Sequence, residues 1–167
     1  DFLMNSVTCI SPSKAFNLAG LQIANIISAN EYVRMKINKA INTNEVCDVN
    51  PFGVEALIAA YNEGEEWLEV LKQYLLDNYN YLKRYFEKYL PHLKVLPLEG
   101  TYLVWLDCSA LKQSSEEIAK ALLDKEKLLV NDGNMYGEAG KDFIRINIAC
   151  PRALLIDGLG RLRRILN

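Results

Sequence analysis

Residues 65–90 constrain the fold of this chain more than any other stretch, because they have the periodicity of one long helix. Residues on one face of that helix recur at spacings of three and four; they are Trp67, Leu71, Tyr74, Asn78, Leu82, Tyr85 and Tyr89. Pro91 then ends the helix, since proline lacks the amide hydrogen that the next turn would need. A helix of this length commonly connects two domains, so we expect the chain to divide around it.

The remainder of the sequence alternates between apolar runs of strand length and helical patterns. Strands are predicted over residues 2–10, 21–28, 93–96, 101–107, 128–130 and 143–149, the first two being buried. Helices are predicted over residues 31–41 with Asn30 as the cap, from Pro51, after a capping box formed by Ser114 and Glu117, and from Pro151. This alternation predicts an α/β fold, with an α/β sandwich in the second half of the chain.

A polar turn, Ser11 to Gln22, separates the first two apolar runs and contains Lys14. A lysine in a loop is most often a solvated surface charge, and the spacing alone favours that interpretation. The functional interpretation is an amine held at the edge of a sheet for covalent chemistry with a carbonyl compound.

Composition narrows the function classes. The chain has 167 residues and a net charge of −2, with its basic residues scattered, which argues against a nucleic-acid-binding face. No apolar run is long enough to span a bilayer, and no signal peptide is visible. The four cysteines, Cys9, Cys47, Cys108 and Cys150, are far apart in the sequence. This spacing predicts no metal site and indicates a reducing cytoplasm.

The turn around Lys14 resembles the cofactor-lysine signature of the pyridoxal-phosphate (PLP) enzymes of the class I/II aminotransferase family. The matching pattern is Ser-x-Ser-Lys-x-Phe-x-Leu-x-Gly-Leu. SPSK-x-FNLAGLQ is most similar to the cystathionine β-lyase and cystalysin-like C–S lyase branch. The resemblance continues through residues 99–107 and 143–152, in the order that the family has them.

The resemblance implies a fold and a domain organisation. The chain would be the C-terminal portion of a fold-type-I PLP-dependent transferase, a fragment of a longer enzyme that is homodimeric when complete. Residues 1–64 would end the large PLP-binding domain, residues 65–90 would be the linking helix, and residues 91–167 would be the small α/β domain.

The resemblance also assigns roles around the cofactor. Lys14 would form the covalent link to PLP and act as the catalytic base, and Ser11, with Ser13 as a less supported neighbour, would bind the phosphate. Without the lysine, Ser11 would be read as an ordinary turn serine. Typical aminotransferases have an arginine where this chain has Gln22, and the lyase-like branch shares the glutamine. Gln22 therefore favours a lyase. Its amide would still bind the cofactor phosphate through a hydrogen bond, although it lacks the charge that strengthens such a bond.

Two arginines are the candidates for binding the substrate. Arg145 matches the arginine that holds the α-carboxylate of an amino-acid substrate, and its planar fork suits a bidentate contact. The alternative for Arg145 is a surface ion pair. Arg152 is a weaker second candidate, and Gly133 to Gly137 form either a plain turn or a loop over the pocket.

The function that follows from the resemblance is PLP-dependent C–S β-elimination on an amino acid. Transamination is the alternative within the same class, because the lysine alone does not distinguish the two outcomes. A non-catalytic binding module that retained the fold is the alternative from another class.

Overall fold

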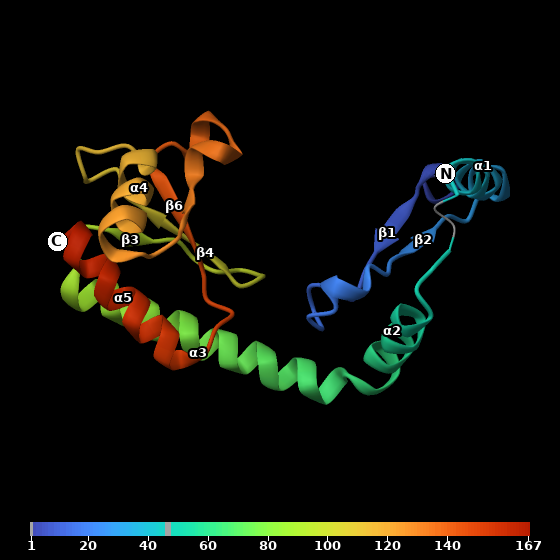
Figure 1. The fold of residues 1–167 in the computed structure, drawn as a ribbon, viewed down its shortest axis with the longest axis horizontal. Coiled ribbons are helices and arrows are strands. Elements are labelled where there is room, and N and C mark those ends of the chain that lie inside the picture. The colour runs from blue at the N-terminus through green and yellow to red at the C-terminus, as the bar shows by residue number, and fades with distance from the viewer. Residues whose placement is uncertain (1, 46–47) are drawn as a thin grey trace. The chain divides into compact units, whose positions relative to one another are not determined.

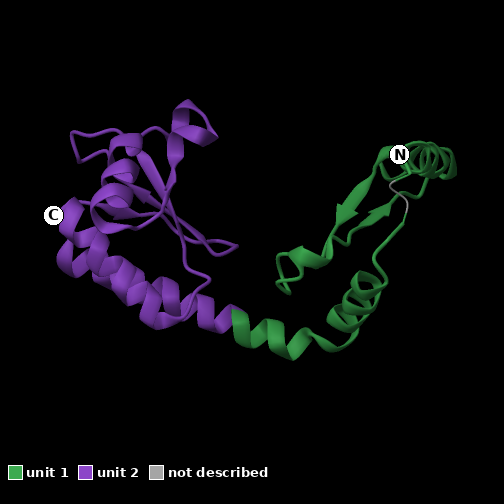
Figure 2. Ribbon diagram, in the orientation of Figure 1, with its two compact units in different colours: residues 1–71 green, residues 72–167 purple. Residues whose placement is uncertain are grey.

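The computed structural model of the chain describes residues 2–45 and 48–167. Figure 1 shows the order of the helices and strands. Two compact units, Asp1–Leu71 and Lys72–Asn167, share the long helix α3 (Glu65–Tyr89), within which the division between them falls (Figure 2). The expected single helix over residues 65–90 is therefore confirmed, whereas the division into three parts stays a prediction.

The first unit contains a two-stranded antiparallel pair, β1 (Thr8–Ile10) and β2 (Asn25–Ile27), in which Cys9 lies opposite Ile26. The predicted buried strand over residues 2–10 is confirmed as a strand only at Thr8–Ile10, and the prediction of its burial was wrong because these side chains are exposed. Leu3–Asn5 form a 3-10 turn (η1), and the side chain of Phe2 is 97% exposed because no described layer covers it. The second strand is shorter than residues 21–28 because Gln22 adopts a left-handed backbone, with φ 51°, which a strand does not accommodate. Its predicted burial was also wrong, since Ile26 and Ile27 are exposed.

Two capped helices follow in the first unit, α1 (Glu31–Thr43) and α2 (Pro51–Glu63). The Asn30 side-chain oxygen accepts hydrogen bonds from the backbone N–H groups of Tyr32 (3.0 Å) and Val33 (3.4 Å), which confirms it as the cap of α1. Pro51 begins α2, as predicted, at a position where the missing amide hydrogen costs nothing.

The second unit is an α/β sandwich, as expected. Its antiparallel sheet has the order β3-β4-β6-β5. The strands are β3 (Lys94–Val95), β4 (Leu103–Asp107), β5 (Asn131–Asp132) and β6 (Phe143–Asn147), and the helices besides α3 are α4 (Ser115–Glu126) and α5 (Arg152–Leu166). The predicted strand over residues 128–130 was wrong. Lys127 ends α4 in a left-handed conformation, and pairing with β6 begins only at Asn131.

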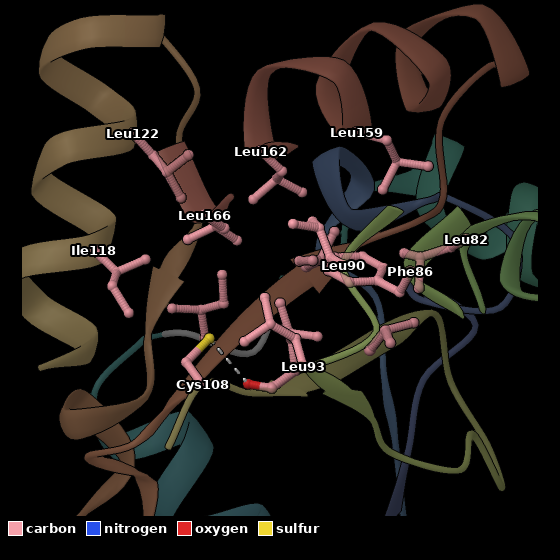
Figure 3. Close-up of a cluster of buried hydrophobic side chains, with 14 of the residues drawn as sticks. Leu82, Phe86, Leu90, Leu93, Cys108, Ile118, Leu122, Leu159, Leu162 and Leu166 are labelled. Atoms are coloured by element: carbon pink, nitrogen blue, oxygen red, sulfur yellow. Dashed lines mark hydrogen bonds between the residues drawn. The ribbon is translucent and has the colours of Figure 1, made fainter. Parts of the chain in front are cut away.

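One face of this sheet is buried under the helices, and Figure 3 shows the resulting core. Val104 and Leu106 of β4 alternate with exposed or half-buried neighbours, as do Ile144 and Ile146 of β6, so all four point to the helical side. They pack with buried side chains of the helices, among them Leu82, Phe86, Ile118, Leu122, Leu155, Leu159, Leu162 and Leu166. Trp105 and Arg145 consequently lie on the opposite face of the sheet.

The described residues also answer whether the chain has a membrane-spanning helix, a metal site or disulfide bonds. No helix in the described part of the chain is both long and apolar enough to cross a membrane. Within the same residues, no cluster of histidine, cysteine or acidic side chains could hold a metal ion. Cys9, Cys108 and Cys150 are free thiols, and Cys47 lies outside the described residues.

Candidate functional site

The six predicted site residues form two groups, one in each unit. Ser11, Ser13, Lys14 and Gln22 belong to the first unit, and Arg145 and Arg152 to the second. Each group has its own set of supporting contacts within its unit.

The turn that carries Lys14 is closed by its own backbone. The N–H of Phe16 donates to the carbonyl of Pro12 (2.9 Å), and the N–H of Leu18 donates to the carbonyl of Ser13 (3.0 Å). The Phe16 ring lies 5.9 Å from the ring of Trp67, stacked, and 6.2 Å from the ring of Tyr61, edge-on. These aromatic contacts fasten the turn to α2 and to the start of α3, and they leave the Lys14 side chain exposed.

The two serines of the turn are in direct contact. Their hydroxyl oxygens are 2.5 Å apart, and the Ser11 hydroxyl also donates to the carbonyl of Ile23 (2.7 Å). Because a serine hydroxyl has one hydrogen, the Ser13 hydroxyl is then the donor to Ser11. Ser11 also accepts from the backbone N–H of Ser13 (3.1 Å). The turn thus places two hydroxyls, a lysine amine and a nearby amide in one segment, a donor set that suits a phosphate and an aldehyde.

Gln22 lies at the end of a 3-10 turn, η2 (Ala19–Leu21), and its side chain is exposed. Its backbone N–H donates to the carbonyl of Ala19 (3.3 Å), and its left-handed conformation redirects the chain into β2.

Arg145 projects from β6 between two neighbouring strands. Trp105 of β4 is its partner on one side, and Asn131 of β5 is its partner on the other. One terminal nitrogen of Arg145, Nη2, donates to the Asn131 side-chain oxygen (3.2 Å). The carbon of the guanidinium lies 4.4 Å from the centre of the Tyr136 ring and 6.0 Å from that of Trp105. Among the described residues, Arg145 is therefore held by two aromatic rings and an amide rather than by an acidic side chain.

Sequence reasoning missed the roles of Asn131, Trp105 and Tyr136. A signal for Trp105 existed, because the alternation of apolar residues in β4 and β6 places it on the same face as Arg145. Asn131 lies outside the predicted strands, and only the pairing of β5 with β6 shows that it lies beside Arg145.

Arg152 has structural partners. Its Nε donates to the side-chain oxygen of Asn78 (2.7 Å), and its guanidinium lies 4.8 Å from the centre of the Tyr81 ring. The buried Asn78 amide in turn donates to the carbonyls of Ile148 (2.9 Å) and Cys150 (3.0 Å). These contacts join the start of α5 to α3, which is a sufficient reason for an arginine at this position.

The comparisons with known proteins cover both groups of residues. The family model described as aminotransferase class I and II matches residues 3–162. The chain belongs to the class I and II aminotransferase family. It is 38% identical to the cystathionine beta-lyase PatB of Bacillus subtilis (strain 168) over all of its own length, but it spans only 43% of that relative.

Solved structures give the same result for the fold of this family member. A PLP-bound protein of Clostridium difficile 630 matches with 39% identity and a TM-score of 0.95, over 99% of this chain and 43% of the other. Cystalysin of Treponema denticola, which contains PLP, matches with 30% identity and a TM-score of 0.92, over 98% and 42%. The fold is therefore that of the C-terminal part of these PLP enzymes.

Proposed function

We propose that the full-length protein is a PLP-dependent enzyme that eliminates a thiol from the β-carbon of an amino acid. The observation that carries the proposal is the Lys14 turn, in which a lysine amine follows two hydroxyls in contact with each other. Gln22, in place of an arginine, supports a lyase rather than an aminotransferase. The names of the relatives, cystathionine beta-lyase and cystalysin, agree with this choice.

The donor set of the turn fits PLP. Lys14 would hold the cofactor covalently, and the hydroxyls of Ser11 and Ser13 with the amide of Gln22 would face its phosphate. In the structure both serine hydrogens are used within the turn, so binding a phosphate requires at least one hydroxyl to rotate. When bound, PLP supplies an electron sink for the substrate Cα.

Arg145 and Lys14 would have different roles in the elimination. Arg145 would hold the substrate carboxylate and so orient the Cα–H bond. The Nζ of Lys14 would remove the Cα proton, after which the Cβ–S bond breaks and its electron pair leaves with the sulfur. The remaining three-carbon unit would hydrolyse to pyruvate and ammonia.

The test uses the full-length protein supplied with PLP. Borohydride reduction followed by peptide mapping should place the pyridoxyl label on Lys14, and a cysteine thioether should yield pyruvate and ammonia. Lys14→Ala should lose both results, while Lys39→Ala, which removes an exposed lysine of α1, should keep both. Label on another lysine would refute the site. A keto acid that retains the sulfur, together with pyridoxamine phosphate, would show a transaminase instead.

We extend the proposal to a cytoplasmic homodimer. Its support is the apolar surface of the first unit, which exposes Val7, Ile10, Ile26 and Ile27 around the β1–β2 pair, and the free state of Cys9, Cys108 and Cys150. Sedimentation of the full-length protein at monomer mass would contradict the dimer. Fractionation that placed the protein outside the cytoplasm would contradict the location.

A further inference from the structure

The side chain of Arg145 leaves one of its donors buried and unused. Among the described residues, its Nε is the buried side-chain nitrogen or oxygen without a hydrogen-bond partner. A buried N–H group without an acceptor lowers the stability of the fold, so the contacts that bury it are expected to serve another purpose. The surroundings are the rings of Tyr136 and Trp105, whose planes meet nearly at right angles (83°) with centres 5.3 Å apart.

We propose that Tyr136 is a positioning residue for substrate recognition, which stacks on Arg145 and presents the terminal edge of its guanidinium to the substrate carboxylate. This inference rests on the proposed function, because it assumes an amino-acid substrate. It goes further by naming the residue that fixes the arginine and the nitrogens that remain for the ligand.

The arrangement of donors determines which edge of Arg145 is open. A guanidinium has five N–H groups, of which one is on Nε and two are on each terminal nitrogen. The Nε hydrogen is shut off from solvent, and Asn131 takes one hydrogen of Nη2. The hydrogens of Nη1 and the second hydrogen of Nη2 therefore remain for a bidentate carboxylate.

The loop that carries Tyr136 is built to hold its ring in place. Tyr136 ends a 3-10 turn, η3 (Gly133–Tyr136). Asp132 caps this turn, because its side-chain oxygen accepts a hydrogen bond from the backbone N–H of Asn134 (2.9 Å). The same Asp132 oxygen accepts from the hydroxyl of the buried Ser115 at the start of α4 (2.5 Å). The loop is thus tied to the core at its base.

Two glycine features complete the support of this loop. Gly133 and Gly140 approach each other so closely that a Cβ on either would overlap the backbone of the other. Gly137, directly after Tyr136, has φ 109°, which other residues rarely adopt. These glycines therefore allow the backbone conformation of the loop on both sides of Tyr136.

The stacking explains how Arg145 keeps its position without an acidic partner. An acidic neighbour would compete with the substrate carboxylate for the same hydrogens, whereas an aromatic face attracts the cation and leaves the N–H groups in its plane free. Tyr136 and Trp105 therefore position the guanidinium and spare its hydrogen-bonding capacity.

The experiment compares variants of the full-length, PLP-loaded protein with two substrates, a cysteine thioether and the corresponding amine without the carboxylate. Tyr136→Leu should raise the KM for the amino acid roughly 2- to 30-fold, the range of a cation–π contact, with a smaller change in kcat. Tyr136→Phe should stay near wild type, because the ring face is retained. Arg145→Lys is the reference for a lost bidentate contact and should lower kcat/KM roughly 30- to 150-fold.

Two further variants separate positioning from folding. Pentafluorophenylalanine at position 136 keeps the shape of the ring but reverses its quadrupole, and it should raise the KM as Tyr136→Leu does even if the leucine variant folds poorly. Glu138→Gln, in the same loop, removes only an exposed ion pair with Lys141 and should leave the kinetics unchanged.

The outcomes are distinguishable. A KM in the pentafluoro variant equal to that of wild type would overturn the role of Tyr136, and so would an equal rise for the amine that lacks a carboxylate. If the wild-type protein turns over neither substrate, the proposed function itself fails and this inference fails with it.

Discussion

Arg145 and Arg152 have the same functional group and opposite kinds of surroundings. The contacts of Arg152 with Asn78 and Tyr81 tie two helices together. Among the described residues, by contrast, Arg145 uses only one hydrogen of its terminal nitrogens, the one that Nη2 donates to Asn131. The sequence motif identifies both as candidates, but it does not separate them. The difference comes from residues distant in sequence, such as Asn78 and Asn131, whose positions depend on how α3 and β5 pack.

Cys108 is a residue whose ionisation is linked to the stability of the second unit. Burial, followed by the negative charge of Asp107, raises the pKa of the Cys108 thiol from 9.0 to about 12. Since the folded pKa is raised, the thiol contributes stability that is fully present below pH 9.0 and is lost as the pH rises towards about 12. Denaturant unfolding should therefore show wild type losing stability relative to Cys108→Ala between pH about 9 and about 11.

A thiol reagent gives an independent check on the same residue. Native protein should react at the exposed Cys9 and should leave Cys108 unmodified until it unfolds. Rapid labelling of Cys108 in the native state, or parallel pH profiles for wild type and Cys108→Ala, would contradict the prediction.

At the scale of single elements, local signals in the sequence determine where several helices begin. Asn30, Pro51 and the Ser114–Glu117 pair act within a few residues of their own positions, and the structure confirms all three. The strand predictions were less successful because a strand needs a partner. Residues 2–5 and 128–130 are apolar enough for strands, yet they have no neighbouring strand and form a 3-10 turn and an irregular segment.

The capping box of α4 stabilises the start of that helix. The Ser114 hydroxyl accepts from the N–H of Glu117 (3.2 Å), and the Glu117 carboxylate accepts from the N–H of Ser114 (2.9 Å). Ser114→Ala should lower the free energy of unfolding by about 1 kcal/mol, since one helix N–H loses its partner. Ser114→Asp keeps an acceptor at the cap and should stay within a few tenths of wild type. Equal losses in both variants would mean that the cap contributes nothing specific.

For the whole molecule, the two units differ in how well they are packed. The second unit has a contiguous core whose members include Leu82, Leu106 and Ile144, each 0% exposed. The β1–β2 pair of the first unit consists of two three-residue strands with mostly exposed side chains. The sequence predicted the α/β character of the second unit because its strands alternate clearly. It did not predict the exposure of β1, because burial depends on layers that a strand pattern does not identify.

Hydrogen exchange on a polypeptide of these 167 residues should display this difference. The amides that pair β4 with β6 should exchange only when the core opens, whereas an isolated pair such as β1–β2 is marginally stable in water. We expect the β1–β2 amides to exchange roughly a thousandfold faster. Equal protection in the two sheets would show that the first unit has a stability that its described contacts do not provide.

The Asn78 amide has a mechanical consequence for the second unit. Its side chain makes three hydrogen bonds, to the carbonyls of Ile148 and Cys150 and to Nε of Arg152, so α3 at this point is joined directly to the segment that follows β6. A displacement of α3 at Asn78 would therefore strain the hydrogen bonds that hold the chain just after β6, the strand that carries Arg145.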